Sequence, residues 1–297
     1  MRHLVTGGLG FIGQHLVDLL LVRGDDVLIV DDNRAGNPVR DDCEVVQDTF
    51  GSWDYDEQFA AVWHLASPVG PVGVLNQAGR ITGEVFRGAE NAATLAMRSD
   101  VPLIHRSTSE VYGGGDRGLC AEDMDCRVST NLSARLEYQT AKLAVEVMLQ
   151  NTDGLDARII RPFNVSGAGQ KPEGGFVLPR WKQQVQTGQA LTVYAPGTQR
   201  RAMTHVHDIV EGMYAVWQMG EPGLWNLGNP ENVISMVDLA ELFVDVAGGR
   251  WEMVDPVELH GAKFVEAAEK FPDAAKAMSL GWNPSRSLRE IVEDVLL

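Results

Sequence analysis

Residues 105–115, HRSTSEVYGGG, place hydroxyl groups and a carboxylate where a buried strand is expected to end. The apolar run 101–104 precedes them and three glycines follow. Ser, Thr and Glu often satisfy loose backbone groups at such positions, so turn chemistry is one interpretation. A functional site is the other, because Thr108 can donate and accept hydrogen bonds and Glu110 can transfer a proton.

A glycine-rich turn, TGGLGFIG at 6–13, follows one expected strand and opens an expected helix. Gly7 permits the tight turn, Gly10 lets backbone N–H groups approach a pyrophosphate, and Gly13 lets the helix pack close to the sheet. The positive end of the helix dipole also favours phosphate at this point. Glycines alone suit an ordinary turn as well, but their order and context predict a dinucleotide-binding site.

A carboxylate stands where the second expected strand ends, in LIVDDN, and Asp31 comes 18 residues after Gly13. In a dinucleotide site, a carboxylate here accepts hydrogen bonds from the adenosine ribose hydroxyls and repels a 2′-phosphate. The alternative role for Asp31 is that of an exposed loop acid. Together with the glycine turn, Asp31 predicts NAD rather than NADP as the cofactor.

A tyrosine and a lysine are four residues apart in YQTAK, 138–142, within a stretch that favours a helix. This spacing puts Tyr138 and Lys142 on one helix face. Tyrosine ordinarily ionises near pH ~10 and is a poor base at neutral pH. An ammonium one turn away, beside a cationic nicotinamide, favours the phenolate and lowers its pKa toward the working range. The pair is common by chance, but its position after the polar strand end predicts a catalytic role.

The chain has 297 residues, and its 41 acidic residues outnumber its 25 basic ones to give a net charge of −16. A surface of this charge repels nucleic acid and anionic membranes, so neither is expected as a partner. The three cysteines lack metal-ligand spacing and suit a reducing cytoplasm, and no metal is expected. The sequence opens with an expected strand rather than a signal peptide, and no apolar run is long enough to cross a bilayer. We therefore expect a cytoplasmic protein.

Short apolar segments alternate with helical ones through the first half of the chain. This alternation predicts an α/β fold of Rossmann type, with a doubly wound parallel sheet buried on both faces. We expect an NAD-binding domain over 1–167, onto which 204–228 packs back, and a smaller, partly interleaved substrate domain over 168–297. Capping boxes at Ser235 and Ser287 predict two later helices. The expected strands are 3–5, 27–30, 44–46, 61–65, 103–105 and 158–160, and the expected helices are 12–23, 81–98 and 133–150.

Ordered motifs run through almost the entire chain. They are TGGLGFIG (6–13), Asp31, HLAS (64–67), STSEVYG (107–113), Tyr138 with Lys142, RPFN (161–164), LTVYAPGTQRRAMTHVHDIVEG (191–212), NLGNPE (226–231) and KAMSLGW (276–282). In this order they resemble the motifs of the extended short-chain dehydrogenase/reductases. The resemblance implies an NAD-dependent enzyme that acts on a nucleotide sugar and forms a homodimer through helices 81–98 and 133–150.

The resemblance also implies a role for each motif. The implied catalytic residues are Thr108, near the sugar C4 hydroxyl, Glu110, Tyr138 as base and Lys142 as its tuner. The implied NAD-binding residues are Gly7, Gly10, Phe11, Ile12, Gly13, Asp31, Asp32, Asn33, Asp48, Leu65, Ala66, Ser107, Tyr138, Lys142 and Pro162. The implied substrate-binding residues are Ser67, Pro68, Thr108, Ser109, Glu110, Asn164 and Arg201.

Glu110 bears on which sugar chemistry the resemblance implies. A 4-epimerase needs only oxidation at C4, rotation and reduction, and typically lacks this glutamate. Glu110 favours further chemistry at C5 or C6, by a nucleotide-sugar 4,6-dehydratase or a UDP-glucuronate decarboxylase. The stretches HLASPVGP, STSEVYG and NLGNPE are similar to the decarboxylases, and Ser109 stands where many dehydratases carry an aspartate. We expect a UDP-glucuronate decarboxylase that makes a UDP-pentose or releases the 4-keto sugar. An NAD-binding sensor or scaffold is the non-enzyme alternative.

Some positions depart from the family pattern. Val85 stands where an asparagine is usual, Gln170 where decarboxylases usually carry an arginine, and Met203 where an aromatic residue is usual. These departures concern the sugar side of the site and leave the NAD side unchanged. His205 and His207 lack partners at metal-ligand spacing, so they predict no metal site.

Overall fold

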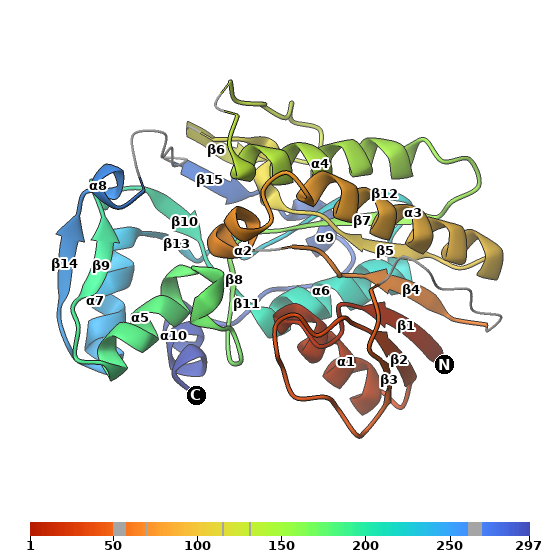
Figure 1. Ribbon diagram of the computed structural model, residues 1–297, viewed down its shortest axis with the longest axis horizontal. Coiled ribbons are helices and arrows are strands. Elements are labelled where there is room, and N and C mark those ends of the chain that lie inside the picture. The colour runs from red at the N-terminus through yellow and green to blue at the C-terminus, as the bar shows by residue number, and fades with distance from the viewer. Residues whose placement is uncertain (50–57, 69, 115, 131, 261–268) are drawn as a thin grey trace.

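The computed structural model describes residues 1–49, 58–68, 70–114, 116–130, 132–260 and 269–297. Its centre is a seven-stranded sheet in the order β12-β7-β5-β4-β1-β2-β3, in which all pairs are parallel (Figure 1). This arrangement confirms the doubly wound α/β fold. The strands are β1 (Arg2–Thr6), β2 (Asp26–Val30), β3 (Glu44–Val46), β4 (Ala61–His64), β5 (Leu103–Arg106), β7 (Ala157–Pro162) and β12 (Gly223–Leu227).

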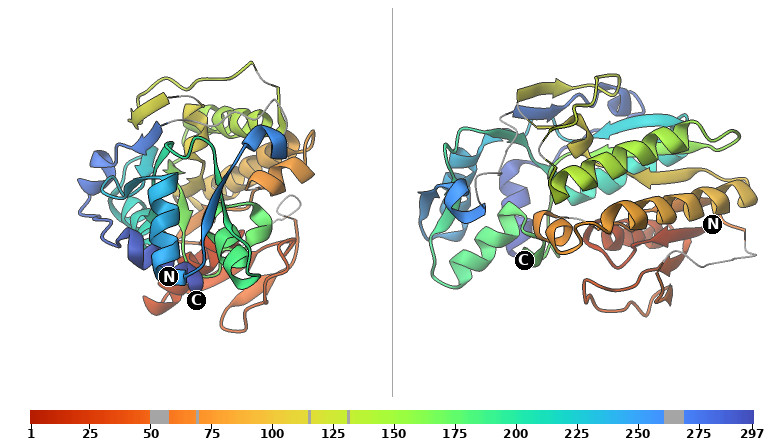
Figure 2. Two further views of the ribbon diagram at one scale, coloured as in Figure 1. Left: turned by 90° about the vertical axis from the view of Figure 1, so that its left-hand side faces the viewer. Right: turned by 45° about the horizontal axis from the view of Figure 1, so that its top comes forward.

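Helices cover both faces of this sheet (Figures 1 and 2). On one face α1 (Phe11–Val22) and α6 (Val206–Met219) pack on a core that includes Val5. On the other face α3 (Ile81–Ser99) and α4 (Ala134–Gln150) pack on a core that includes Leu4. Neighbouring strand residues thus enter opposite cores, which explains why the strands are apolar throughout. The expected strands and helices are all present, with ends that differ by at most two residues.

A second part of the molecule is built around smaller sheets, at the left of Figure 1. One sheet has the order β13-β10-β15-β6, and another pairs β9 with β14. Helices α5, α7 and α10 enclose a separate core there, with Trp181 and Phe243 among its members. The elements are β6 (Asp116–Cys120), α5 (Val177–Gln186), β9 (Leu191–Tyr194), β10 (Arg200–Ala202), β13 (Val233–Ser235), α7 (Met236–Ala247), β14 (Trp251–Val254), β15 (Glu269–Pro272) and α10 (Leu288–Leu296).

The two parts exchange segments. β12 and α6, from the segment expected to pack back, belong to the large sheet and its helical cover. Conversely, β6 leaves the first half of the chain to pair with β15. The short elements are α2 (Pro71–Asn76), η1 (Ser109–Tyr112), β8 (Val165–Ser166), η2 (Pro172–Gly174), β11 (Thr204–His205), α8 (Pro256–His260) and α9 (Ala275–Met278).

The two expected capping boxes differ in detail. At α10 the box is complete, because the hydroxyl of Ser287 accepts the N–H of Glu290 while the glutamate accepts the N–H of Ser287. At α7, Ser235 accepts the N–H of Asp238, but the aspartate accepts the serine hydroxyl rather than a backbone N–H. An aspartate is one methylene shorter than a glutamate, and here it closes only half of the box. In the part of the chain that the structure describes, no helix is long and apolar enough to span a bilayer.

Candidate active site

The loops after neighbouring strands meet at one edge of the large sheet. Thr6 of β1 pairs with His64 of β4, which pairs with His105 of β5, and Arg106 pairs with Ile160 of β7. Because parallel strands carry their carboxyl ends to the same edge, the residues that follow them lie together there. The predicted site residues at this edge are 7–13 after β1, 31–33 after β2, Asp48 after β3, 65–68 after β4, 107–110 after β5, and Pro162 and Asn164 at the end of β7.

The glycine turn has no room for side chains. Gly7 has φ +72°, and a Cβ there would lie 2.7 Å from the backbone nitrogen of Ala66. A Cβ at Gly13 would overlap the carbonyl oxygen of Gly7. Helix α1 begins at Phe11 with neither a side-chain cap nor an acidic residue in its first turn. Its first N–H groups can therefore bind an anion, and the turn fits a diphosphate.

Asp31 is fixed beside this turn. Its Oδ2 accepts the N–H of Leu9 at 3.0 Å and its Oδ1 accepts the N–H of Asn33 at 2.8 Å. Each oxygen keeps a lone pair for a ribose hydroxyl. Burial raises the pKa of Asp31, and the two N–H groups act in the opposite direction. The neighbouring Asp32 instead forms an ion pair with Arg34 at 2.5 Å.

Tyr138 is buried close to the end of β5. The side chains of Thr108 and Arg106 lie near its hydroxyl. Burial raises the pKa of Tyr138, Arg106 lowers it and Glu110 raises it further. One turn along α4, the Nζ of Lys142 donates to the carbonyl oxygen of Arg106 at 2.9 Å. Burial holds the pKa of Lys142 well below its ordinary value.

Two cations hold Glu110. The Nζ of Lys270 lies 2.7 Å from Oε1, and Nη2 of Arg135 lies 2.9 Å from Oε2. Burial by itself would raise the pKa of Glu110, but these two cations lower it well below its ordinary range. Glu110 is therefore a carboxylate that cannot donate a proton while both ion pairs persist. Sequence reasoning missed both cations, since Lys270 is 160 positions away from Glu110 and Arg135 looks like a solvated helix residue.

Arg201 extends this group of cations. It is the register partner of Lys270 on the neighbouring strand, so both side chains lie on the same face of the smaller sheet. Both residues are buried. Asn164 joins the end of β7 to this sheet by donating to the carbonyl oxygen of Ala202 at 3.1 Å. In a chain with a net charge of −16, these cations form a local positive region that suits a diphosphate or a carboxylate.

Comparison with known proteins agrees with this geometry. The model of the NAD dependent epimerase/dehydratase family matches residues 3–228, which is most of the chain. The chain belongs to this family. Its members use NAD, which confirms the cofactor expected from the glycine turn and Asp31.

Within the family, the chain is similar to decarboxylases over nearly its full length. It is 34% identical to UDP-glucuronic acid decarboxylase 6 of Arabidopsis thaliana over 316 residues, which cover 98% of this chain and 86% of that protein. It is 30% identical to UDP-glucuronic acid decarboxylase 1 of Danio rerio over 299 residues, which cover 97% and 70%. Among solved structures, MoeE5 in complex with UDP-glucuronic acid and NAD has a TM-score of 0.81 and 26% identity, covering 100% of this chain and 98% of that one.

A buried ionic network lies next to the predicted site and joins α4, β7 and the end of β5. The carboxylate of Glu146 on α4 accepts hydrogen bonds from the guanidinium of Arg161, whose Nη2 lies at 2.6 Å, and from the hydroxyl of Ser107. Arg161 donates to the Tyr112 hydroxyl at 2.9 Å, which donates to Asn226 at 2.8 Å. Sequence reasoning missed this network, although Glu146 is one turn beyond Lys142 on the same face of the helix. The predicted cofactor residue Ser107 thus has its hydroxyl directed to Glu146.

Of the three residues that depart from the family pattern, two are buried in hydrophobic cores and one is hydrogen-bonded within a loop. Val85 is buried in the core between α3 and the sheet, and Met203 is buried in the same core as Trp181 in the second part of the molecule. Gln170 accepts the hydroxyl of Ser166 at 2.9 Å and donates to the carbonyl oxygen of Val165 at 3.1 Å. Gln170 is therefore bound within its own loop.

The remaining predicted site residues lie at the strand ends as well. The hydroxyl of Ser67 donates to the carbonyl oxygen of Pro68 at 3.1 Å. Ser109 is buried as the first residue of η1. Pro162 ends β7, opposite Leu227 of β12.

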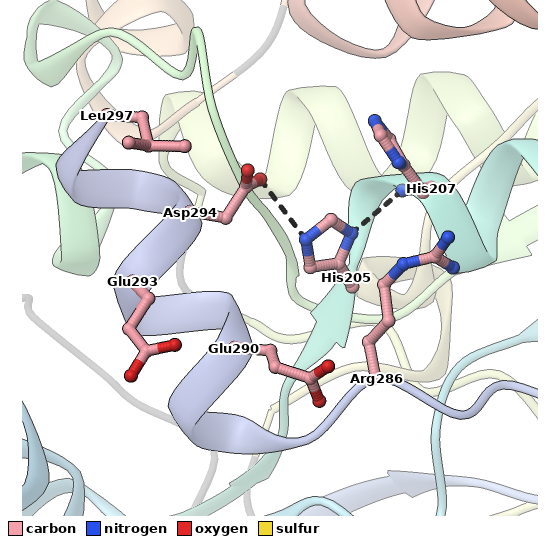
Figure 3. Close-up of a pocket in the computed structure, with 7 residues that line it drawn as sticks. All are labelled: His205, His207, Arg286, Glu290, Glu293, Asp294 and Leu297. Atoms are coloured by element: carbon pink, nitrogen blue, oxygen red, sulfur yellow. Dashed lines mark hydrogen bonds and ion pairs between the residues drawn. The ribbon is translucent and has the colours of Figure 1, made fainter.

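A histidine-rich depression lies against α10 (Figure 3). The Nε2 of His205 lies 3.1 Å from Asp294, and its Nδ1 accepts the N–H of His207 at 3.1 Å. The Nε2 atom of His207 lies 3.1 Å from the Nδ1 atom of His15 on α1. Burial lowers the pKa of both His205 and His207. Among the residues described, no three His, Cys, Asp or Glu side chains are arranged to hold a metal ion.

Proposed function

We propose that this family member is a UDP-glucuronate decarboxylase, a carboxy-lyase. It would oxidise C4 of the sugar, release the C6 carboxylate as CO2, and then either reduce the ketone to a UDP-pentose or release it. The observation that carries the proposal is the 30–34% identity to UDP-glucuronic acid decarboxylases over almost the whole chain. MoeE5 adds a relative whose structure contains UDP-glucuronic acid together with NAD.

The positive region beside Glu110 supports a nucleotide-sugar acid as the substrate. Arg201 and Lys270 come from neighbouring strands, and Arg135 comes from the start of α4. A UDP-sugar carries a diphosphate, and a glucuronate adds a carboxylate. We assign Arg201 and Lys270 to the diphosphate, since guanidinium and ammonium groups bind phosphate oxygens through charge-assisted hydrogen bonds. We assign Arg135, which pairs with the partly exposed Glu110, to the sugar carboxylate.

Tyr138 is the base that takes the proton of the C4 hydroxyl. It is buried, and the side chain of Thr108 lies near its hydroxyl. A sugar hydroxyl placed between these two groups can donate to Tyr138 while it accepts from Thr108. The glycine turn and Asp31 would hold NAD, which would supply the hydride acceptor for C4.

Loss of CO2 follows from the ketone at C4. The C6 carboxylate is attached to C5, so it is β to the new carbonyl group. Cleavage of the C5–C6 bond releases CO2 and leaves the electron pair in an enolate whose charge is on the C4 oxygen. Tyr138, now protonated, and Thr108 are placed to donate hydrogen bonds to this oxygen. C5 then takes up a proton. Return of the hydride to C4, with the proton of Tyr138 passing to the C4 oxygen, completes the UDP-pentose.

Glu110 has a restricted role in this sequence of steps. Because Lys270 and Arg135 hold it as a carboxylate, it is a poor proton donor to C5. We assign it to orienting a water molecule that protonates C5, and to holding the two cations in place. Its replacement by glutamine keeps the shape but loses the charge, so both tasks suffer.

The proposal is tested by a product screen of the purified protein. UDP-glucuronate, UDP-glucose, dTDP-glucose and GDP-mannose are each incubated with NAD, and the products are identified by mass spectrometry. We expect only UDP-glucuronate to react, with loss of one CO2. Y138F should reduce turnover by a factor of about 10²–10⁴ while NAD still binds. Loss of water from a neutral hexose would show a 4,6-dehydratase and refute the proposal.

The ion pairs of Glu110 favour one alternative, a UDP-glucuronate 4-epimerase. Such an enzyme needs no acid or base at C5. Because Glu110 is held in two ion pairs, Tyr138 is then the residue that transfers the proton. Substitution separates the two functions. E110Q should slow a decarboxylase well below the wild-type rate, whereas an epimerase should keep most of its turnover and retain the carboxylate.

We also propose that the enzyme is a cytoplasmic homodimer. Helices α3 and α4 lie side by side on one face of the sheet (Figure 2). Both expose apolar side chains, including Met97 and Val147. The free thiols Cys43, Cys120 and Cys126 are consistent with a reducing compartment. Light scattering at micromolar concentration should give twice the mass of the chain, and a monomer would contradict the dimer.

A further inference from the structure

Arg34 lies in the turn after β2, the turn that also carries Asp31. Backbone N–H groups fix this turn. The N–H of Asn33 donates to Oδ1 of Asp31 at 2.8 Å. The N–H of Arg34 donates to Oδ1 of Asp32 at 3.0 Å. The side chain of Arg34 therefore starts close to the carboxylate that we assign to the adenosine ribose.

The guanidinium of Arg34 is held by acceptors from three places. On its own turn, Nε and Nη2 lie 2.7 and 2.5 Å from Oδ2 of Asp32. In the first turn of α3, Oε2 of Glu84 lies 2.8 Å from Nη1. At the end of α2, Oε1 of Gln77 accepts a hydrogen bond from the same nitrogen at 3.0 Å. Each of the three nitrogens of Arg34 thus already has a carboxylate partner.

An arginine at this place in a dinucleotide site has a second possible partner. A guanidinium near the carboxylate that ends the second strand can bind the 2′-phosphate of NADP. Its planar fork of donors matches phosphate oxygens as well as carboxylate oxygens. In this protein the donors of Arg34 are directed to Asp32 and Glu84 instead.

We propose that Asp32 and Glu84 contribute to cofactor specificity by withholding Arg34 from the 2′-phosphate of NADP. Asp31 excludes NADP by direct repulsion, whereas Asp32 and Glu84 exclude it by occupying a cation that suits the phosphate. The turn after β2 is therefore a 2′-phosphate site that two carboxylates keep closed. The inference concerns the cofactor alone and does not depend on which sugar reaction the enzyme performs.

A second cation contacts the same turn in a different way. The Nζ of Lys171 donates to the carbonyl oxygens of Ala35 and Gly36, at 2.8 and 3.3 Å. Lys171 comes from the segment just before η2, and these two partners are neutral main-chain groups. It is therefore the matched control for a general effect of positive charge near the turn.

The exposure of the ion pairs sets the size of the expected effect. The side chains of Asp32 and Glu84 are 24% and 31% exposed, and that of Arg34 is 47% exposed. A single exposed ion pair is weak, and either carboxylate alone still holds the guanidinium. Release of Arg34 must therefore remove both charges. We expect release to strengthen NADP binding by about tenfold, which corresponds to about 1.4 kcal/mol.

The test uses D31S as the parent, because this variant lacks the direct repulsion of a 2′-phosphate. D31S/D32N/E84Q converts both carboxylates to amides of the same shape, and the amide oxygen of D32N can still accept the N–H of Arg34. Calorimetry should show NADP binding about tenfold tighter than to D31S, with a much smaller change for NAD. Adenosine 2′,5′-bisphosphate compared with AMP isolates the phosphate and should show a gain in the same direction.

The gain must depend on Arg34. D31S/D32N/R34Q/E84Q should lose it, whereas D31S/D32N/E84Q/K171Q should keep it. A gain that survives R34Q would come from the loss of two negative charges and would overturn the inference. The absence of any gain, or a gain that K171Q removes and R34Q does not, would overturn it as well.

A simpler pair of variants covers the case in which the triple variant is unfolded by circular dichroism. E84Q is then added to D31S with and without R34Q, and the same ligands are titrated. A smaller gain in NADP affinity is expected with Arg34 present, because Asp32 remains, and none is expected with R34Q. Equal NADP affinities of D31S and D31S/E84Q would refute the role of Glu84.

Discussion

The buried pair of Glu146 and Arg161 gives the sharpest stability prediction. Glu146 is 1% exposed and Arg161 is 3% exposed. The guanidinium approaches both carboxylate oxygens, with Nε at 3.0 and 3.2 Å and Nη2 at 2.6 Å. E146Q keeps the shape of the side chain, but it removes the negative charge and can direct an amide donor toward the guanidinium.

Arg161 would then be a buried cation without a counter-ion. Removal of one partner of such a pair typically costs about 3–5 kcal/mol, because the remaining charge stays desolvated. Tyr112 contributes only a neutral hydroxyl to Arg161, so it cannot replace the carboxylate. We expect E146Q to lower the free energy of unfolding by an amount in this range.

Urea unfolding at pH 7, followed by circular dichroism, measures this cost. The matched control is the double variant E146M/R161M, which removes both charges. Its loss in the free energy of unfolding should be smaller than the sum of the losses in E146M and R161M. The difference, which is the interaction energy, should be about 1–3 kcal/mol. A cost below about 1 kcal/mol for E146Q, or strict additivity of the two methionine variants, would refute the reasoning.

Three further predictions concern the cofactor site and one helix end. Because Asp31 repels a 2′-phosphate, calorimetry should show NAD binding at least about tenfold tighter than NADP. D31S should reduce this ratio of affinities, and equal affinities in the wild type would contradict the role of Asp31. G13A should weaken NAD binding by more than about tenfold because its Cβ would overlap the carbonyl oxygen of Gly7, whereas G73A, with open space around the Cβ, should bind NAD normally. S287A should lose about 1 kcal/mol of stability in urea, the usual value of a helix cap, and no loss would mean that the box at α10 contributes little.

Local features of the sequence predicted much of the fold and the cofactor side of the site. The glycine turn and Asp31 are short-range signals, because turn, helix start and strand end lie within one β-α-β unit. Apolar runs of three to five residues between expected helices likewise predicted six of the seven central strands. Spacing of four residues placed Tyr138 and Lys142 on one face of α4, and the same rule extended by one turn would have found Glu146.

The cations of the site could not be predicted in the same way, because their positions depend on contacts between distant segments. Lys270 reaches Glu110 only because β6 leaves the first half of the chain and pairs with β15. In the sequence, Arg106 resembles an ordinary charged residue that follows an apolar run. Its burial depends on contacts between distant segments: its guanidinium donates to the carbonyl oxygen of Leu65, and Lys142 on α4 donates to its own carbonyl oxygen.

The measurement that tests the proposed function most directly follows the C6 carbon of the substrate. UDP-glucuronate labelled with ¹³C at C6 is incubated with the enzyme, and carbon NMR records whether the label appears as CO2 and bicarbonate. We expect the label to leave the sugar only when NAD is bound, in wild-type enzyme and not in Y138F. Full retention of the label on a sugar with inverted C4 would contradict decarboxylation and identify a UDP-glucuronate 4-epimerase.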